Sequence, residues 1–318
     1  MSEVSRGHLV YTGRRVFLKY HRLLSGAHPY PPNSLAALRR VLAEGAEVVE
    51  FDIRLTRDEK FVLLHDSTLE RETSGRGPLS QVTEAQFKSL QLRDSDEPTA
   101  TLAAVVDILR DTDRPLKVQV DLKELEPISS ETADLLLAAI APMRENPRIS
   151  VVVGCMGDWN LRSLRRLDPG LHVGLDFAYY LDAPVDALVR LPLRINAYGY
   201  LDDHPLGYRR LLSTRAYLED RMDVLLNLVP GASEFYVRKE FLLQSLTDGM
   251  NPVQFIHERK PGALVDVWTL HADDPDLERV LLAALDAGAD QISSPTCALL
   301  AEFLAGFGGR QNCGSRLI

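Results

Sequence analysis

The chain has 318 residues, of which 45% are hydrophobic and 25% are charged, and its formal net charge is −9. This composition is typical of a globular protein with a large core, and the length allows one α/β barrel or two smaller domains. The negative charge argues against tight nucleic-acid binding, which requires clustered basic side chains. It does not exclude a small anionic substrate, because a bound divalent cation can reverse the local field.

Cysteine usage and the N-terminal sequence indicate a reduced intracellular protein, which we expect to be cytoplasmic. Cys155, Cys297 and Cys313 are widely spaced and form no zinc-binding pattern. Residues 1–15 carry charges throughout and lack the apolar core of a signal peptide. Because no run reaches about 18 apolar residues, we expect no membrane-spanning segment. The sequence leaves oligomerisation open.

Short runs rich in Val, Ile and Leu alternate with helical patterns, as is typical of parallel strands buried on both faces. One predicted helix begins after Asn33 and Ser34, which can cap it, and ends at Gly45. A similar helical pattern covers residues 274–288. The predicted strands cover residues 16–20, 48–53, 117–123, 150–155, 171–176, 193–198, 263–269 and 290–294. This alternation predicts a TIM barrel, with residues 1–318 as a single domain and a core at about 16–305.

A further apolar run, residues 61–65, follows the second strand too closely for a parallel crossover, which needs about a dozen residues. The two runs therefore predict a β-hairpin. A turn centred between Arg57 and Asp58 would place residue 50 opposite residue 65. The hairpin would then bring His65 back beside Glu50.

Residues 201–262 depart most from the barrel pattern. Within them, residues 206–229 predict one or two helices, and residues 234–246 are ambiguous between strand and helix. We expect this region to be an elaborated loop on the C-terminal rim of the barrel, where binding segments usually lie.

Two strand ends carry acidic residues at a spacing of two. Glu50 and Asp52 point to the same face of their strand, and a Mg²⁺ or Ca²⁺ ion would offset their repulsion. An exposed edge strand is the alternative, although the apolar neighbours of this pair disfavour it. Asp121 and Lys123 repeat the spacing, so Asp121 can complete the carboxylate set and Lys123 can meet a phosphate oxygen. A structural ion pair is the more common role of such a pair.

Three further side chains lie at predicted strand ends. Arg22 can bind phosphate oxygens with two hydrogen bonds, and the neighbouring His21 can exchange a proton near neutral pH, as can His65. Structural roles are common for lone histidines, but these two are expected to share one barrel rim with the other polar groups. Trp268 offers either a surface for the substrate alcohol or ordinary core packing.

These residues lie in motifs that resemble those of the glycerophosphodiester phosphodiesterase family. The first group of matching stretches is His21-Arg22-Leu23, Pro31–Ser34, Gly45–Ile53, Thr56–Glu59, His65-Asp66 and Leu69–Thr73. Later matches are Pro98-Thr99, Asp121–Lys123, Val267–Leu270 and Gly288–Ile292. The resemblance spans about residues 16–305 and is weakest over 201–262. In the family's pattern a Gly stands at Leu23, a Glu at Pro32 and a Glu at Asp121.

The resemblance implies a metal-dependent enzyme that hydrolyses a glycerophosphodiester to an alcohol and glycerol phosphate. By matching position, the ligands of one Mg²⁺ or Ca²⁺ ion would be Glu50, Asp52 and Asp121. The resemblance likewise implies that His21 and His65 form the acid/base pair and that Arg22 and Lys123 hold phosphate. The attacking group, water or a substrate hydroxyl that forms a cyclic phosphate, stays open.

Two alternatives remain. The Asp-x-Lys pattern at residues 121–123 is closer to the related sphingomyelinase D-like enzymes, which implies phospholipase D-like cleavage of a lysophospholipid. The changes at Leu23 and Pro32 leave room for a non-catalytic barrel that binds a phosphorylated ligand. The presence of both histidines, three carboxylates, Arg22 and Lys123 favours an enzyme.

Overall fold

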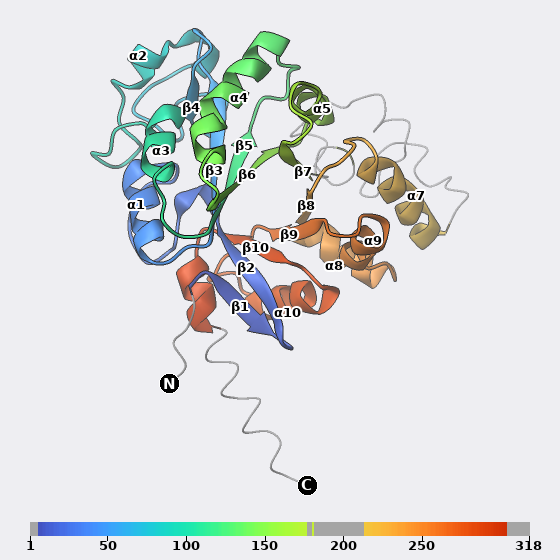
Figure 1. Cartoon of the computed structure of the whole chain (residues 1–318). Helices are drawn as coiled ribbons and strands as arrows, with labels where there is room; N and C mark the ends of the chain where they lie inside the picture. The colour runs from blue at the N-terminus through green and yellow to red at the C-terminus, as the bar shows by residue number, and fades with distance from the viewer. Residues whose placement is uncertain (1–5, 177–179, 181–212, 304–318) are drawn as a thin grey trace.

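The computed structural model describes residues 6–176, 180 and 213–303 and contains a closed barrel of eight parallel strands (Figure 1). Each barrel strand pairs with two neighbours, and the pairing of the first two strands closes the ring. The barrel strands are β2 (Arg14–Tyr20), β3 (Val48–Leu55), β5 (Leu116–Leu122), β6 (Ile149–Cys155), β7 (His172–Asp176), β8 (Glu234–Arg238), β9 (Leu264–Trp268) and β10 (Gln291–Ser294). The predicted TIM barrel is confirmed.

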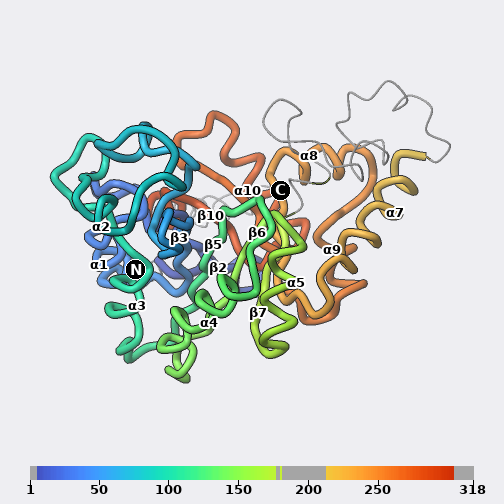
Figure 2. The backbone as a smooth tube through the Cα atoms, turned by 90° about the horizontal axis from the view of Figure 1, so that it is seen from above, coloured from blue at the N-terminus to red at the C-terminus, as the bar shows by residue number. Residues whose placement is uncertain are grey.

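Helices cover the outside of the barrel, as the view from above shows (Figure 2). They are α1 (Leu35–Ala43), α2 (Glu84–Phe87), α3 (Leu102–Leu109), α4 (Ser130–Arg144), α5 (Asp158–Leu167), α7 (Thr214–Leu226), α8 (Lys239–Thr247), α9 (Pro252–Arg259) and α10 (Leu277–Ala287), with short 3₁₀ turns η1 (His21–Leu23) and η2 (Leu79–Gln81). Ser34 caps α1 by accepting the backbone N–H of Ala37 at 3.0 Å. Gly288 ends α10 in the left-handed conformation, with φ of 104°.

Two strands lie outside the closed ring. β1 (His8–Tyr11) pairs antiparallel with β2, and β4 (Phe61–Leu63) pairs antiparallel with β3. The β-hairpin is therefore confirmed, but its register differs by one residue from the predicted one, because Ile53 lies opposite Leu63. The turn is centred on Asp58, so His65 does not lie opposite residue 50.

The sixth barrel strand differs from the predicted one. Residues 193–198, predicted as this strand, lie outside the described residues, and β8 occupies the place between β7 and β9. The range 201–262 therefore supplies a barrel strand together with α7, α8 and α9, and is not only a rim loop. Its strand was hard to predict because it starts with a charged residue, Glu234, whose side chain is buried.

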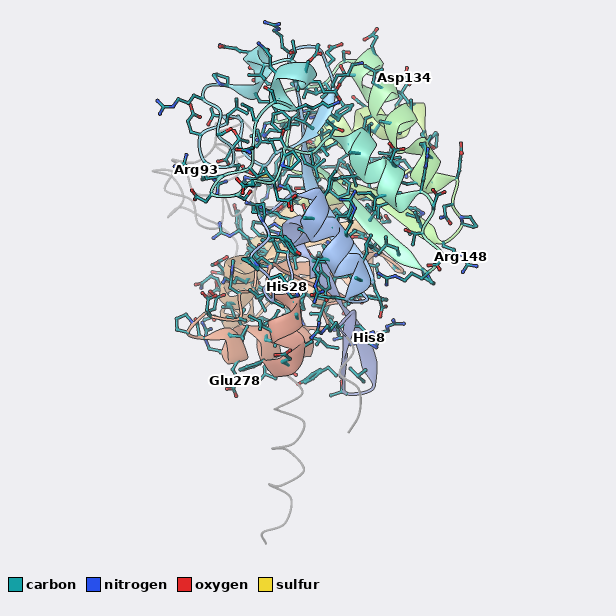
Figure 3. All side chains as sticks on the ribbon, turned by 90° about the vertical axis from the view of Figure 1, so that its left-hand side faces the viewer. His8, His28, Arg93, Asp134, Arg148 and Glu278 are labelled. Atoms are coloured by element: carbon teal, nitrogen blue, oxygen red, sulfur yellow. The ribbon has the colours of Figure 1, made fainter. Side chains whose placement is uncertain are left out.

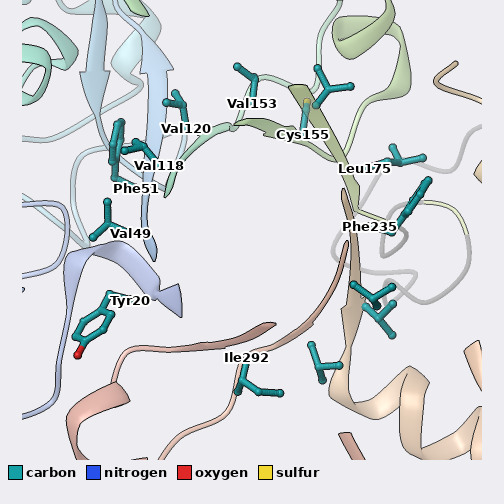
Figure 4. Close-up of a cluster of buried hydrophobic side chains, with 14 of the residues drawn as sticks. Tyr20, Val49, Phe51, Val118, Val120, Val153, Cys155, Leu175, Phe235 and Ile292 are labelled. Atoms are coloured by element: carbon teal, nitrogen blue, oxygen red, sulfur yellow. The ribbon is translucent and has the colours of Figure 1, made fainter. Parts of the chain in front are cut away.

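The apolar core lies between the barrel wall and the helices (Figure 4). Val49 and Phe51 of β3 point outward into this layer and are fully buried. Each side chain of this size contributes about 1.5–3 kcal/mol by leaving water. Because side chains alternate along a strand, Glu50 and Asp52 point inward.

The inside of the barrel is polar, whereas a TIM barrel is usually filled by branched apolar side chains. Lys19 is 1% exposed, donates to Gln119 Oε1 at 2.5 Å and lies 3.3 Å from Asp266 Oδ2. Nearer the N-terminal end, Lys117 Nζ lies 2.5 Å from Glu234 Oε1. These pairs offset the cost of burying the charges.

Candidate active site

The predicted site residues gather at the C-terminal end of the barrel, around β3 and β5. These strands pair in a register that puts Asp52 opposite Asp121 and Glu50 opposite Gln119. Lys123 follows directly after β5, and its backbone N–H donates to Ile53 of β3. The alternation predicted from the sequence therefore brings three carboxylates and an ammonium group to one mouth of the barrel.

The three carboxylates form a compact oxygen cluster. Glu50, Asp52 and Asp121 each offer an oxygen within 4.8 Å of the others. Burial raises the pKa of Glu50 well above its ordinary value, and the negative charge of Asp52 adds to the shift. Burial alone would also raise the pKa of Asp52, but Lys123 and Arg22 hold it well below its usual range. One member of the cluster therefore binds a proton readily while its neighbour stays ionised.

This cluster fits a hard divalent cation. Asp52 Oδ1 is buried and makes no hydrogen bond within the described part of the chain. The Lys123 ammonium lies 3.1 Å from this oxygen and offsets part of the cost of burying it, and the same ammonium also pairs with Asp121. The donor set, three carboxylates without sulfur, is the type that Mg²⁺ and Ca²⁺ prefer.

Two cationic side chains border the carboxylates. Arg22 Nε lies 3.3 Å from Asp52 Oδ2, and Arg22 also donates its backbone N–H to Glu50 Oε2 at 2.7 Å. Burial opposes the charged form of Lys123, but Asp121 and Asp52 raise its pKa well above the ordinary value. Lys123 therefore stays charged at neutral pH, and both side chains lie within reach of an anion that approaches the cluster.

The chain turns sharply after β2 to place these groups. Arg22 and Leu23 both adopt the left-handed conformation, with φ of 53° and 64°, and Leu23 is fully buried. This conformation costs roughly 1–2 kcal/mol for each non-glycine residue. The turn directs the Arg22 N–H to Glu50 and its carbonyl to the N–H of Asn33, at 2.9 Å.

Asn33 is a site residue that sequence reasoning assigned to another role. It was expected to help cap α1, but Ser34 is the cap, and the Asn33 amide instead contacts Asp52. Asn33 Nδ2 donates to Asp52 Oδ2 at 2.9 Å, and Asp52 N donates to Asn33 Oδ1 at 3.2 Å. The signal in the sequence was that Ser34 can cap the helix by itself, which leaves Asn33 free for another role.

The two histidines approach the cluster from different elements. His21 Nε2 lies 3.9 Å from Glu50 Oε2, and burial, together with Arg22, lowers the pKa of His21 well below its ordinary value. His65 lies beyond the end of β4, and its Nδ1 is 2.8 Å from Asp66 Oδ1. Burial lowers the pKa of His65, and the charge of Asp52 acts in the opposite direction. Asp52 also raises the pKa of His21, so both imidazoles interact electrostatically with the carboxylate cluster.

Trp268 ends β9, where Arg238 of β8 lies opposite it. The indole Nε1 is buried and has no hydrogen-bond partner among residues 6–176, 180 and 213–303. The Trp268 side chain is half-buried, and among these residues its N–H lacks the hydrogen bond that a buried tryptophan usually makes.

A separate cavity of about 510 Å³ lies at the opposite, N-terminal end of the barrel. Arg15, Lys117 and Arg148 line it, but Arg15 pairs with Glu47, and Lys117 pairs with Glu234. None of the candidate site residues lines this cavity.

Comparison with protein families gives one match that covers most of the chain. The model of the glycerophosphoryl diester phosphodiesterase family matches residues 21–287. The chain belongs to this family. The resemblance expected from the sequence and the enzyme class are thereby confirmed.

Individual relatives agree with this assignment. A glycerophosphodiester phosphodiesterase of Caldanaerobacter subterraneus subsp. tengcongensis is 28% identical over 184 residues, which cover 56% of this chain and 71% of that protein. A Mycobacterium tuberculosis protein described as a "probable glycerophosphodiester phosphodiesterase 1" is 32% identical over 54% of this chain and 69% of its own length.

Solved structures share the fold. The glycerophosphodiester phosphodiesterase of Thermotoga maritima superposes with a TM-score of 0.56 at 18% identity, over 91% of this chain and 98% of that one. An Oleispira antarctica phosphodiesterase, solved with the product sn-glycerol-3-phosphate, gives a TM-score of 0.61 at 18% identity, over 92% and 96% of the two chains.

Leu23, one of the departures noted in the sequence, adopts a positive φ of 64°. Glycine adopts this conformation without steric cost, so the turn is retained here at some expense in strain. Among the helices that the structure describes, none combines the length and apolar character that a bilayer crossing requires.

Proposed function

We propose that this protein hydrolyses a glycerophosphodiester to an alcohol and glycerol phosphate in a reaction that depends on one divalent cation, Mg²⁺ or Ca²⁺. The observation that carries the proposal is the arrangement at the barrel mouth. His21, Arg22 and Lys123 contact a cluster of three carboxylates, and His65 lies beyond the end of the neighbouring strand β4. These groups are what phosphodiester cleavage requires: charge stabilisation at the phosphoryl oxygens and proton transfer on both sides of the phosphorus.

Glu50, Asp52 and Asp121 would hold the cation, and a bound cation supplies Lewis-acid stabilisation of charge on the phosphoryl oxygens. Asn33 fixes the orientation of Asp52 from the far side. The amide contacts hold this carboxylate in place before the substrate arrives, which reduces the reorganisation needed during the reaction.

Arg22 and Lys123 would bind the substrate phosphate. Both already lie at Asp52, with Arg22 Nε at 3.3 Å and Lys123 Nζ at 3.1 Å from its oxygens. The charge that develops on the phosphoryl oxygens during the reaction strengthens these contacts in the transition state. Trp268, with its unpartnered indole N–H, would contact the alcohol or glycerol part of the substrate.

His21 and His65 would transfer the protons. We assign removal of the proton from the attacking hydroxyl to His21, because burial and Arg22 lower its pKa and so favour the neutral imidazole that can accept a proton. Burial lowers the pKa of His65, but its Nδ1 faces the carboxylate of Asp66, which opposes that shift and favours the protonated ring, so we assign protonation of the leaving alkoxide to His65.

The test is the release of alcohol from glycerophosphocholine, glycerophosphoethanolamine, glycerophosphoinositol and lysophosphatidylcholine, with EDTA or with added Mg²⁺ or Ca²⁺. We expect metal-dependent release from at least one glycerophosphodiester. His21→Ala and His65→Ala should each lose about 10²–10⁴-fold in turnover. His172→Ala is the matched control, because His172 is exposed at the start of β7, at the other end of the barrel.

The outcomes separate the alternatives. Choline release from lysophosphatidylcholine alone would favour the phospholipase D-like activity. Tight binding of glycerol phosphate without turnover of any diester, in folded and metal-loaded protein, would favour a non-catalytic binding barrel. Wild-type turnover in His21→Ala or His65→Ala would remove that residue from the mechanism.

A further inference from the structure

We propose that Asp66 is a positioning residue that fixes both the orientation and the tautomer of His65. The proposal rests on the proton-transfer role proposed for His65. The ring nitrogen His65 Nδ1 lies 2.8 Å from Asp66 Oδ1. A carboxylate can only accept a hydrogen bond, so the ring must carry its proton on Nδ1. Nε2 is then the nitrogen left to exchange a proton with the substrate.

A second contact competes for the same nitrogen. Arg71 Nη2 lies 3.3 Å from His65 Nδ1, and a guanidinium group can only donate. If Arg71 donated to Nδ1, the ring would carry its proton on Nε2 alone, and giving that proton to the leaving alkoxide would leave an unfavourable imidazolate anion. The two arrangements exclude each other in the neutral ring. The contact with Asp66 is shorter and involves a full negative charge, so it determines the tautomer.

Asp66 is itself held by several contacts. Arg71 donates to both of its carboxylate oxygens, which occupies the guanidinium group and leaves the contact with Nδ1 as a secondary one. The backbone N–H of Asp66 donates to Glu72 Oε1 at 2.8 Å, and that of His65 donates to Glu72 Oε2 at 3.2 Å.

The same segment is tied to the barrel. Arg54 of β3 donates from Nε to the carbonyl oxygen of His65 at 2.7 Å. Glu72 is 9% exposed, so its two backbone contacts are partly shielded from water. The ring of contacts from His65 to Glu72 therefore fixes both the backbone and the imidazole of His65, as supporting hydrogen bonds do at other catalytic sites.

The decisive measurement is nitrogen-15 NMR of the His65 ring, which separates the two tautomers, combined with steady-state kinetics. In the wild type we expect the proton on Nδ1. In Asp66→Ala the Arg71 N–H becomes the partner of Nδ1, so the proton should move to Nε2. We expect kcat to fall about 10–100-fold, as is typical of supporting residues, while KM changes little. Asp66→Asn keeps an acceptor oxygen and should recover part of the loss.

Two further variants complete the test. Arg71→Ala removes the competing donor and leaves the proton on Nδ1, so it should cost less turnover than Asp66→Ala. Arg71→Ala also tests the proposal if Asp66→Ala folds poorly. If the wild-type ring carries its proton on Nε2 and the Arg71→Ala ring carries it on Nδ1, then Arg71 and not Asp66 determines the tautomer, and the proposal is overturned. Asp134→Ala is the matched control, since Asp134 is exposed at the outer edge of the molecule on α4 (Figure 3).

A folded Asp66→Ala variant with wild-type kcat and a proton still on Nδ1 would also overturn the proposal. Full turnover in His65→Ala would instead overturn the proposed role of His65, and with it any effect of Asp66 on catalysis. The two failures are therefore distinguishable.

Discussion

Asn33 and Asp52 contact each other twice, once through the Asp52 side chain and once through its backbone. The amide of Asn33 donates to the carboxylate at 2.9 Å and accepts the Asp52 N–H at 3.2 Å. Asn33 is 1% exposed and has φ of 57°, a conformation that Asn tolerates better than most residues. The pair fixes the central carboxylate of the cluster relative to the start of α1.

The first prediction concerns this pair. Asn33→Gly keeps the left-handed backbone accessible but removes the amide, so we expect Mg²⁺ or Ca²⁺ affinity to fall about 10–100-fold. Titration calorimetry of the metal-free protein measures the effect. Asn33→Ala adds backbone strain and should unfold at a lower temperature than Asn33→Gly. Wild-type cation affinity in the glycine variant would show that the amide does not orient Asp52 for metal binding.

The second prediction concerns Glu50 and pH. Its pKa is raised in the folded protein, so its contribution to stability is fully present below its unfolded pKa of about 4.3 and is lost as pH rises through the folded value. In EDTA, the contribution of Glu50 to the free energy of unfolding should therefore fall as the pH rises from its unfolded pKa to its folded pKa. The fall is at most about 1.4 kcal/mol per pH unit. Glu50→Gln should remove this component.

Urea unfolding of the wild type and of Glu50→Gln, at a series of pH values in EDTA, checks it. The difference between the two proteins isolates Glu50, because the depressed pKa of Asp52 contributes with the opposite sign and is present in both. Parallel curves for the two proteins would contradict a raised pKa for Glu50.

The third prediction concerns the strained turn at Leu23. Leu23→Ala removes a fully buried side chain and keeps the left-handed strain, so it should cost about 2–5 kcal/mol of stability. Leu23→Gly loses the same packing but relieves the strain, so it should be more stable than Leu23→Ala by roughly 1–2 kcal/mol.

Leu38 is the matched control for Leu23, because it is also fully buried but lies within α1. In a helix, Gly is less stable than Ala by about 1 kcal/mol, so Leu38→Gly should be less stable than Leu38→Ala. Chemical unfolding of the four variants gives the order. The same order at both positions would show that the turn at Leu23 is not strained.

The fourth prediction concerns Gly154 of β6. A Cβ at this position would lie 2.5 Å from Asp121 Oδ1 and 2.8 Å from Gln119 Nε2. The Asp121 carboxylate must then move, so Gly154→Ala should weaken cation binding at least tenfold, which calorimetry would measure. Gly170→Ala is the control, because among the described residues the one atom within 4 Å of its Cβ would be Asp168 Oδ1, at 3.3 Å. Wild-type cation affinity in Gly154→Ala would exclude Asp121 as a positioned ligand.

Much of the fold was predictable because strands buried on both faces carry a strong local pattern. Seven of the eight predicted barrel strands match described strands, since runs such as residues 48–53 are continuously apolar apart from the inward acidic pair. β8 escaped prediction because aromatic and charged residues break its pattern, and Lys117, which pairs with Glu234, is distant in the sequence.

The sequence predicted which side chains meet at one end of the barrel but not their contacts, and their roles in metal binding and catalysis stay predictions. The spacing of Glu50 and Asp52 fixed which side chains share a face, and strand ends at one rim follow from the barrel. The hairpin register came out one residue away from the prediction, because a turn centred on Asp58 and one centred after Arg57 look alike in the sequence. The contact between Asn33 and Asp52 depends on the left-handed backbone conformation of Asn33, which the sequence pattern does not reveal.

The hairpin strand β4 lies outside the closed ring of strands, and it pairs with β3 on one edge and touches residues 100 and 101 on the other. One of the two candidate proton-transfer groups, His65, therefore follows a strand attached to the barrel, while His21 directly follows the barrel strand β2. A substitution in the loop after β4 that displaces the His65 ring would leave all eight strands of the closed ring unchanged. For this protein, a correctly folded barrel therefore does not by itself show that His65 is correctly positioned.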